Sequence, residues 1–223
     1  MPRIRRICSV LLAALEISCN ASSTGSVAAG PLPKPERDLT VTAKSGEPAT
    51  AAFAGGCFWC VEAVFEPLDG VLNAVSGYAG GASESANYNA VSAGKTKHAE
   101  AVQITYDPAK ISYGTLLQVF LSTHDPTTLD RQGTDLGHQY RSAIFYATDE
   151  QKEVAQAYIR QLEQAKVFDK PIVTTLERLE KFHAAEDYHQ NFVARNPDHP
   201  YVRAWVPAKL KKLREQYPQL LKK

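Results

Sequence analysis

The sequence has almost no net charge. Its 223 residues include 25 Lys and Arg against 24 Asp and Glu, a formal charge of +1. Nucleic-acid binding depends on a strong basic field, so we expect no polynucleotide partner. No apolar run after Leu15 is long enough to cross a membrane as a helix. The fractions of hydrophobic residues, 44%, and charged residues, 22%, exclude a disordered or collagen-like chain and indicate a globular one.

Methionine and cysteine are scarce. Met1 is the single methionine, and there are four cysteines. A chain of this length buries roughly 70% of the surface that its unfolded form exposes, so it needs no disulfide framework to fold. Cys8 and Cys19 lie in the first twenty residues, and Cys57 and Cys60 are the only other thiols. We expect one domain with extensions, acting as a monomer without a metal or a cofactor.

The first 21 residues have the pattern of an export signal. Three arginines between residues 3 and 6 precede the apolar run from Ile7 to Leu15, and small residues follow. We therefore expect an exported, periplasmic protein, lipid-anchored if cleavage leaves Cys19 first, although Glu16 fits a lipoprotein cleavage box poorly. The alternatives are an organelle peptide or an untargeted start, which would leave the protein cytoplasmic.

Composition divides the rest of the chain into three parts. Residues 22–48 are rich in Pro, Ser and Ala and predict an extended linker, because such a stretch buries too little apolar surface to offset the entropy of ordering it. Residues 49–206 predict a folded catalytic domain, and residues 207–223 a basic tail. The leucines among the tail's lysines allow two interpretations, a segment that covers part of the core and a solvated helix.

Hydrophobic periodicity predicts the order β-α-β followed by β-α-β. The strands are Thr50–Phe53, Val71–Tyr78, Ala99–Tyr106 and Ser142–Ala147, and the helices are Cys57–Glu66 and Ser112–Thr123. This order predicts an α+β fold with a ferredoxin-like split βαβ core, a two-layer α/β plait whose helices cover one face of a mainly antiparallel sheet. Long loops and extra helices at 150–165 and 186–194 surround this core. The same periodicity also fits a decorated sandwich without an active site.

The segment Gly55-Gly56-Cys57-Phe58-Trp59-Cys60-Val61-Glu62 carries the candidate chemistry. Cys57 follows two glycines at a predicted helix start, where unpaired N–H groups and the helix dipole favour the thiolate. Cys60 lies three residues further on the same helix face, so one thiol can attack and the other can close a disulfide. Two alternatives stay open, half of a zinc site and a pair of inert core cysteines.

Aromatic and acidic residues near the thiols are further candidates. Phe58 and Trp59 either wall an apolar pocket for a methyl or thioether group or serve as ordinary core aromatics. Glu100 lies on the apolar face of a predicted strand, where desolvation raises its pKa and makes it a general acid. The alternative for Glu100 is a solvent-exposed position at the strand edge.

The polar loop 125–141 is long for a compact domain. Loops of this length are usually functional or mobile, and the alternative is a solvated excursion. Tyr140, within this loop, and Tyr88 offer hydroxyl groups that can donate hydrogen bonds to a polar substrate atom.

Seven segments resemble the A-type peptide methionine sulfoxide reductases, a family that acts on the S epimer of the sulfoxide. Besides the Cys57 segment they are Gly77-Tyr78-Ala79-Gly80-Gly81, Lys97-His98-Ala99-Glu100-Ala101-Val102, Tyr106-Asp107-Pro108, Asp130-Arg131-Gln132-Gly133-Thr134-Asp135 with Gln139-Tyr140-Arg141-Ser142-Ala143-Ile144, and Ala185-Glu186-Asp187-Tyr188-His189-Gln190. They occur in family order over roughly residues 50 to 195.

The resemblance implies a reaction on methionine sulfoxide, free or within proteins. Cys57 would attack the sulfoxide sulfur, while Glu100, assisted by Tyr88 and Tyr140, protonates and holds the oxygen. Methionine would leave Cys57 as a sulfenic acid, which condenses with a second thiol to a disulfide. Thioredoxin or a thioredoxin-like reductant would then restore both thiols.

The resemblance also implies which residues shape the pocket. Phe58 and Trp59 would enclose the methyl group, and Asp135 would bind the substrate backbone or fix the pocket's hydrogen bonds. Asp187 and His189 would support the pocket.

The chain departs from a common family pattern at the second thiol. Many relatives carry a resolving cysteine near the carboxyl terminus, whereas everything after Cys60 is free of cysteine. Cys60 is therefore the candidate resolver. Ala86-Asn87 precedes Tyr88 where relatives often have a proline-containing turn, which affects the expected loop geometry.

Two rival functions remain compatible with the residues. A thioredoxin-like disulfide oxidoreductase also places Cys-x-x-Cys at a helix start, but it would be indifferent to Glu100. A non-catalytic module that grips methionine-rich or aromatic peptides through Phe58 and Trp59 would keep its binding after Cys57→Ser.

Overall fold

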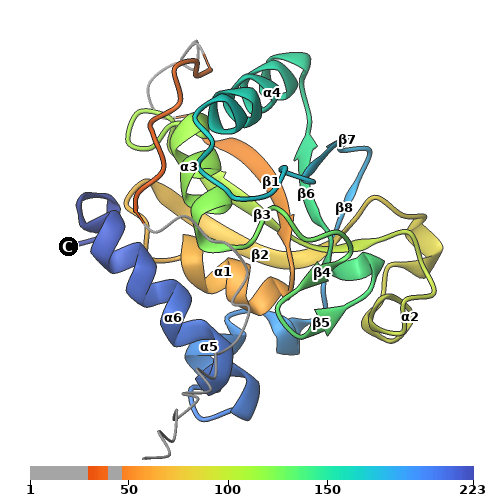
Figure 1. The fold of residues 1–223 in the computed structure, drawn as a ribbon. Helices are drawn as coiled ribbons and strands as arrows, with labels where there is room; N and C mark the ends of the chain where they lie inside the picture. Colours follow the sequence, from red (N-terminus) through yellow and green to blue (C-terminus); the bar gives the residue numbers. More distant parts are fainter. Residues whose placement is uncertain (1–29, 40–46) are drawn as a thin grey trace, which may run out of the picture.

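The computed structural model describes residues 30–39 and 47–223, and its centre is a six-stranded sheet of order β7-β6-β1-β3-β2-β8 (Figure 1). All neighbouring strands are antiparallel except β6 and β7. The strands are β1 (Ala49–Gly55), β2 (Val71–Ala79), β3 (Ala99–Tyr106), β6 (Ser142–Tyr146), β7 (Thr175–Arg178) and β8 (Phe182–Ala184), and β4 (Arg131–Gln132) pairs separately with β5 (Asp135–Leu136). The predicted α+β class and its four strands are confirmed.

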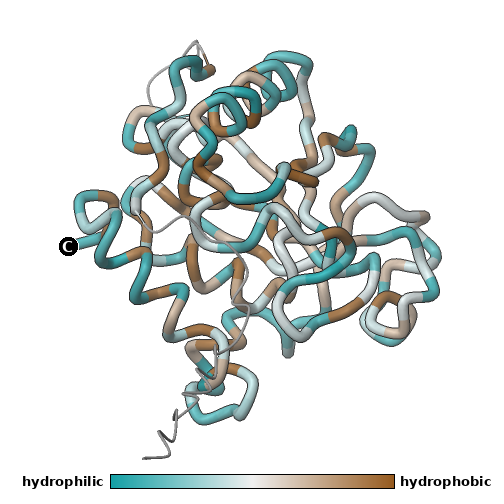
Figure 2. The backbone as a smooth tube through the Cα atoms, in the orientation of Figure 1, coloured by the Kyte–Doolittle hydropathy of each residue, from teal (hydrophilic) through white to brown (hydrophobic). Residues whose placement is uncertain are grey.

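The six described α-helices are α1 (Phe58–Phe65), α2 (Tyr88–Ser92), α3 (Tyr113–Thr123), α4 (Asp149–Gln164), α5 (Phe192–Arg195) and α6 (Pro200–Gln216). Three of them, α2, α3 and α4, begin at a side-chain N-cap. The Ser112 and Thr148 side chains accept N-cap hydrogen bonds at α3 and α4. Hydrophilic residues run along much of α4 (Figure 2), whose buried side carries Val154, Tyr158 and Leu162. No helix among the described residues is both long enough and apolar enough to cross a membrane.

The two faces of the sheet are packed differently. On one face, Phe53 of β1 contacts α1 and α3, stacking on Phe120 with ring centroids 4.8 Å apart. On the other face, small side chains form a second buried layer: Ala52, Ala54, Ala79, Ala99, Ala101 and Ala143, with Phe145. Successive side chains of a strand point to opposite faces, so Phe53 packs in the first layer and its neighbours Ala52 and Ala54 pack in the second.

The sheet is curled. Its edge strands β7 and β8 are joined by residues 179–181 alone, so Arg178 and Phe182 lie at most about 14 Å apart. Six flat strands would put the edges about 24 Å apart at ~4.8 Å per spacing. The short connection therefore requires the edges to approach each other across the alanine face, where small side chains leave the space.

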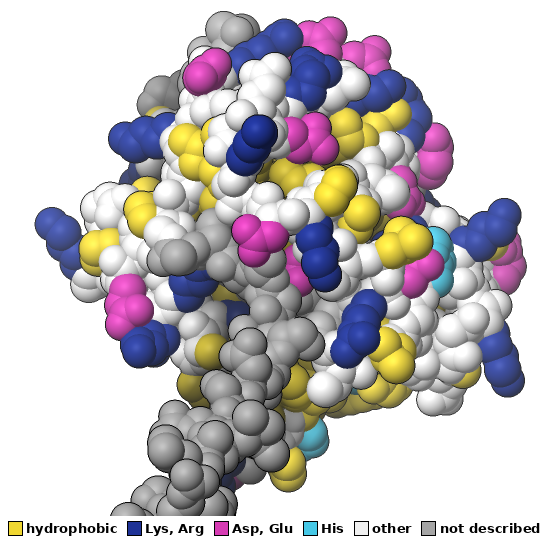
Figure 3. All heavy atoms as spheres, viewed as in Figure 1, with side chains coloured by type: hydrophobic (Ala, Val, Ile, Leu, Met, Phe, Trp, Pro, Cys, Tyr) yellow, Lys and Arg dark blue, Asp and Glu magenta, His cyan; other side chains and the backbone are white. Residues whose placement is uncertain are grey.

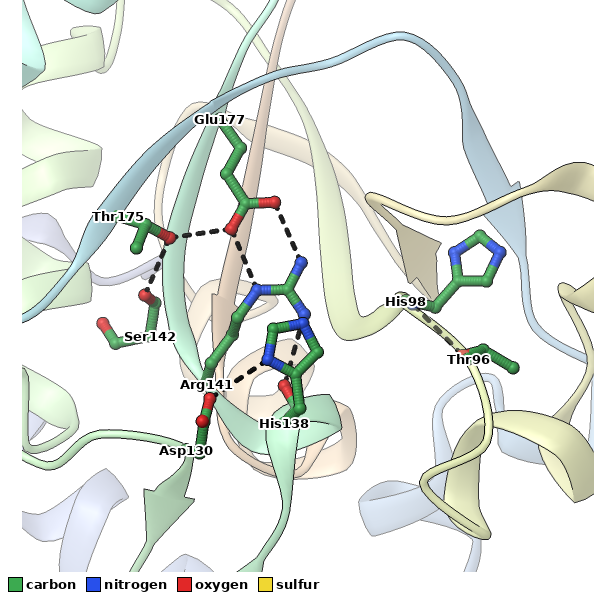
Figure 4. Close-up of polar contacts among 8 residues, drawn as sticks. All are labelled: Thr96, His98, Asp130, His138, Arg141, Ser142, Thr175 and Glu177. Atoms are coloured by element: carbon green, nitrogen blue, oxygen red, sulfur yellow. Dashed lines mark hydrogen bonds and ion pairs between the residues drawn. The ribbon is translucent and has the colours of Figure 1, made fainter.

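A partly buried ion pair fixes one edge of this curl (Figure 4). The Arg141 guanidinium donates two hydrogen bonds of 2.9 Å to the Glu177 carboxylate of β7. Burial opposes ionisation of Glu177, but Arg141 lowers its pKa overall. Gly80, at φ +85°, leaves the room for this pair, since a Cβ there would lie 2.7 Å from Arg141 Nη2. Elsewhere on the surface, Figure 3 shows basic and acidic side chains interspersed on one face.

Residues 30–39 of the predicted linker pack against the domain. Leu32 is buried; its N–H donates to the Tyr217 hydroxyl at 3.0 Å, and its carbonyl accepts from Gln118 Nε2 at 2.6 Å. Asp38 accepts hydrogen bonds at the start of α3, from Gly114 N at 2.8 Å among others. Residues 1–29 and 40–46, which include the predicted export signal, lie outside the described residues.

The chain's last residues also cover the core. Helix α6 runs across residue 206, where the sequence suggested that the domain ends, and buries Leu213 together with Tyr217. Leu221 then forms a β-bridge with Leu68. Of the two interpretations of the tail, a covering segment is the one found.

The helix predicted at 186–194 is wrong in its centre. A 3-10 turn, Asp187–His189, and α5 are separated by Gln190 and Asn191. Gln190 exchanges side-chain hydrogen bonds with the Ser76 backbone at 3.0 and 2.9 Å, which ties the segment to β2. Asn191 takes φ +51° and donates its N–H to Glu62. These tertiary bonds replace the intrahelical ones.

Candidate active site

A glycine turn places Cys57 at the start of α1. Gly56 takes φ +90°, and Cys57 is the residue that precedes the first helical one. A Cβ on Gly56 would lie 2.5 Å from Cγ of Gln132, whose amide is itself held by 3.1 Å hydrogen bonds to the Asp125 N–H and carbonyl. The long loop 125–141 therefore packs directly on the turn that carries the thiol.

Cys57 and Cys60 are free, buried and hydrogen-bonded to each other. Burial raises the pKa of Cys57, and its neighbours Cys60 and Glu100 raise it further. The predicted resting thiolate at Cys57 is wrong, because burial dominates and no N-cap hydrogen bond to its sulfur forms. The hydrogen bond from Cys57 lowers the pKa of Cys60, and the positive charge of Lys209 adds to this effect, although burial opposes it. Cys60 is thus the more acidic thiol.

Glu100 of β3 lies beside this turn and is only 3% exposed. Its Oε2 accepts a hydrogen bond of 3.0 Å from the backbone N–H of Phe58, the first residue of α1. Burial raises the pKa of Glu100 to about 8, with Asp135 and Cys60 adding to the effect and the Phe58 bond opposing it. The expected direction is confirmed, and a carboxyl with this pKa carries a proton at neutral pH.

Two half-buried tyrosines complete the acid side of the site. Tyr88 begins α2, and Tyr140 ends the 3-10 turn His138–Tyr140. Burial raises the pKa of both hydroxyls, and the charges of Glu100 and Cys57 raise it further. Both hydroxyls therefore stay protonated at neutral pH and are available as donors beside Glu100.

Asp135 joins the site through α6. Its Oδ2 accepts a hydrogen bond of 2.5 Å from the Tyr201 hydroxyl. Burial raises the pKa of Asp135, and the Tyr201 bond opposes this. The same hydroxyl contacts both sulfurs of the Cys57–Cys60 pair, and the Tyr201 ring meets Trp59 edge-on at 5.8 Å between centroids. Helix α6 is therefore part of the site.

The aromatic candidates form a wall around His189. Phe58 is buried, with its ring centroid 5.0 Å from that of His189. Trp59 is half-buried, and its ring stacks on that of Phe192 with the centroids 3.7 Å apart. Its Nε1–H donates a hydrogen bond of 3.1 Å to His189 Nδ1. Burial lowers the pKa of His189, so the ring is neutral and its proton lies on Nε2.

Asp187 is the candidate that the structure leaves outside this cluster. Its side chain is exposed, and its backbone carbonyl accepts from Arg195. Its neighbour Glu186 does contribute: one oxygen accepts from the Tyr78 hydroxyl at 2.9 Å and the other from Tyr88 N at 3.0 Å. The sequence contained no signal that favoured Glu186 over Asp187, since both are acidic and adjacent.

Tyr201 and Lys209 were also missed by the sequence analysis. They lie about 140 to 150 residues beyond the thiols, and Lys209 falls in the predicted basic tail, so no local pattern links them to Cys57. The zinc alternative has no support within residues 30–39 and 47–223, where no group of three His, Cys, Asp or Glu side chains could hold a metal ion.

Paired thiols beside a neutral carboxyl, ringed by hydroxyl donors and aromatic side chains, define a thiol-dependent oxidoreductase site. The carboxyl can protonate an oxygen while a thiol attacks the atom that bears it, and the second thiol can then close a disulfide. The comparisons with known proteins give the family. The peptide methionine sulfoxide reductase model matches residues 49–221, and the chain belongs to this family, whose A type reduces the S epimer of methionine sulfoxide.

Curated relatives are similar over most of their length. The chain is 53% identical to peptide methionine sulfoxide reductase MsrA 2 of Synechocystis sp. over 195 residues, covering 86% of this chain and 90% of that protein. It is 52% identical to MsrA of Chromobacterium violaceum, covering 77% and 97%.

Solved structures of the family share the fold. Reduced Mxr1 of Saccharomyces cerevisiae matches with a TM-score of 0.62 and 31% identity, covering 72% of this chain and 92% of that one. Methionine sulfoxide reductase A of Corynebacterium diphtheriae matches with a TM-score of 0.58 and 31% identity, covering 75% and 84%.

Glu62 generates a prediction about stability. It is buried behind the thiols, accepts hydrogen bonds from Ser76 Oγ at 3.0 Å and Asn191 N at 3.1 Å, and has its pKa raised by burial to about 7. The folded protein therefore holds the Glu62 proton more tightly than the unfolded chain. This stabilises the fold below about pH 4.5, and the effect is lost as pH rises to about 7.

Glu62→Gln should remove this dependence. Between pH 4.5 and 7, the free energy of unfolding of the wild type should fall by roughly 3 kcal/mol relative to the variant. Urea denaturation at several pH values measures it, with the exposed Glu163→Gln of α4 as the matched control. Equal pH slopes in wild type and Glu62→Gln would contradict the prediction.

Proposed function

We propose that Cys57 and Glu100 carry out the reduction of methionine sulfoxide together. The observation that supports this most directly is the Phe58 N–H to Glu100 hydrogen bond, because it places a neutral carboxyl at the turn that bears Cys57. Cys57 sulfur bonds to the sulfoxide sulfur as Glu100 protonates the oxygen, and the Cys57 thiol proton returns to Glu100. Oxygen transfers to Cys57 as a sulfenic acid, and methionine leaves.

Tyr88 and Tyr140 hold the sulfoxide oxygen in this proposal. Both hydroxyls remain donors at neutral pH, and both interact electrostatically with Glu100 and Cys57. Asp135 accepts a hydrogen bond from Tyr201, and in this proposal it binds the substrate backbone or fixes the pocket's hydrogen bonds.

The apolar side of the pocket receives the methyl group. Phe58 and Trp59 enclose it, and His189 orients the indole through its Nδ1. Asp187 remains a candidate supporting residue on the resemblance alone.

Cys60 resolves the sulfenic acid. Its sulfur already contacts that of Cys57, and its pKa is the lower of the two. Attack of Cys60 on Cys57 releases water and forms the Cys57–Cys60 disulfide, and a thioredoxin-type reductant restores both thiols. Substrates are free methionine sulfoxide and oxidised methionine in proteins, acted on by a monomer.

The proposal also includes the core fold and the cellular location of the protein. The order β6-β1-β3-β2 with antiparallel pairing, and helices α1 and α3 on one face, support a ferredoxin-like split βαβ core extended by β7 and β8. The pattern of residues 1–21 supports export to the periplasm, with lipidation at Cys19 as a variant of it. The mass of the mature amino terminus distinguishes cleavage, lipidation and retention.

An epimer-resolved assay tests the attacking thiol. Wild type should reduce a peptide S-sulfoxide with dithiothreitol and leave the R epimer unchanged, and Cys57→Ser should lose at least about 10³-fold in rate, because the hydroxyl is a far weaker nucleophile. Chromatography of the methionine product measures this. Unchanged turnover in Cys57→Ser would contradict the proposal, and insulin disulfide reduction that is insensitive to Glu100→Gln would favour the thioredoxin-like alternative.

Cys60→Ser tests the resolver. This variant should release about one methionine per chain and then stop with thioredoxin, because the sulfenic acid has no thiol partner. The equally conservative Ser76→Ala, whose hydroxyl contacts Glu62 rather than the thiols, is the matched control and should continue to cycle. Multiple turnover of Cys60→Ser with thioredoxin would exclude Cys60 as the resolver.

A further inference from the structure

The short helix that carries Tyr88 depends on bonds from other segments for its position. Helix α2 has five residues, Tyr88–Ser92, and is too short to be stable alone. Val91 is its only buried residue. At its start, the Tyr88 N–H donates to Glu186 Oε1 at 3.0 Å. At its end, Ser92 Oγ donates to the Tyr88 carbonyl at 2.6 Å. The place of the Tyr88 hydroxyl therefore depends on what holds the two ends of α2.

The side chain of Gln139 holds the Ser92 end of α2. Gln139 is 6% exposed, and its Nε2 donates a hydrogen bond of 3.1 Å to the Ser92 carbonyl. Its Oε1 lies so close to Gly137 that a Cβ there would collide with it. The amide is therefore packed between α2 and the 3-10 turn His138–Tyr140. It reaches α2 from the residue next to Tyr140.

The turn that carries Gln139 and Tyr140 is itself fixed to the edge of the sheet (Figure 4). Arg141 donates to both carboxylate oxygens of Glu177 in β7 and, from Nη1, to the His138 carbonyl at 3.2 Å. Because Arg141 ties the turn to the sheet, the bond from Gln139 gives α2 a defined position relative to that turn.

Stability alone does not account for the Gln139 amide. Its Nε2 makes one hydrogen bond between neutral groups, while its buried Oε1 accepts none from the described residues. The gain from one such bond and the cost of burying an unpaired acceptor are of similar size, so they largely cancel. What the bond to Ser92 provides is a fixed distance between α2 and the turn.

We propose that Gln139 is a positioning residue for the sulfoxide step: by tying the Ser92 carbonyl to the turn that carries Tyr140, it sets the spacing at which the Tyr88 and Tyr140 hydroxyls hold one sulfoxide oxygen. This inference rests on the proposed role of the two tyrosines. Two donors serve one oxygen well only when they are held within about 0.5 Å of the productive geometry. Loss of the tie therefore lowers the rate while the fold persists.

Rapid-quench measurement of methionine release from a peptide S-sulfoxide tests this role. Gln139→Leu keeps the approximate volume of the side chain and removes the donor to Ser92. We expect its single-turnover rate to fall about tenfold or more. Gln139→Asn, whose side chain is too short for this bond, provides a second variant with the same expected loss.

Gln118→Leu is the matched control. Gln118 is also 6% exposed, and its Nε2 also donates to a carbonyl, that of Leu32 in the segment 30–39. Its substitution should lower the urea midpoint of unfolding as much as Gln139→Leu does and leave the single-turnover rate unchanged. An unchanged rate in both Gln139 variants, or an equal loss of rate in Gln118→Leu, would overturn the proposal.

A double-mutant cycle separates positioning from a general loosening of the site. In a Tyr88→Phe/Tyr140→Phe background no hydroxyl remains to be positioned, so adding Gln139→Leu should slow the reaction by less than about twofold. The full tenfold loss in that background would show that Gln139 acts on something other than the tyrosines and would overturn the proposal.

The cycle also distinguishes this inference from the function on which it rests. If Tyr88→Phe/Tyr140→Phe releases methionine at the wild-type rate, the tyrosines do not hold the oxygen, and both assignments fail. If that variant is slow while the Gln139 variants keep the wild-type rate, the assignment of Gln139 alone fails.

Discussion

One hydrogen bond, from the Phe58 N–H to the Glu100 carboxyl, joins the centre of the sheet to the start of α1. It places the acid beside the thiol and at the same time keeps the acid out of water. At 1.4 kcal/mol per pKa unit, ionising Glu100 in this position costs roughly 5 kcal/mol more than in water. The single bond from Phe58 does not offset that cost, so the carboxyl stays neutral and the site has a proton to give.

The rest of the fold shields this hydrogen bond from water. The glycine turn brings β1 into α1 without a Cβ at Gly56, and Gln132 fills the space. The segment after β8 delivers Glu186 and His189, which fix Tyr88 and Trp59 by hydrogen bonds. Helix α6 closes the remaining side with Tyr201. Segments from both halves of the chain therefore surround Glu100, whose carboxyl could not remain uncharged in solvent.

Much of this arrangement could be predicted from the sequence where the pattern is local. The four strands, the helix at Cys57 and the raised pKa of Glu100 follow from periodicity and from one face of β3. The thiolate at Cys57 was predicted wrongly, because a helix start reveals the dipole but not the burial that outweighs it. Glu186, Tyr201 and Lys209 depend on contacts across more than 60 residues, and the break at Gln190 depends on bonds to β2, so no window of sequence contains them.

The pH dependence of a single turnover tests the central claim that a neutral Glu100 supplies the proton. Release of methionine from a peptide S-sulfoxide is measured by rapid quench in wild type and Glu100→Gln, from pH 6 to 10. The wild-type rate should be level near neutrality and fall above about pH 8, where Glu100 loses its proton. Glu100→Gln should be slower by about 10²-fold or more at neutral pH and lack that fall. Equal rates, or the same fall in the variant, would contradict the account.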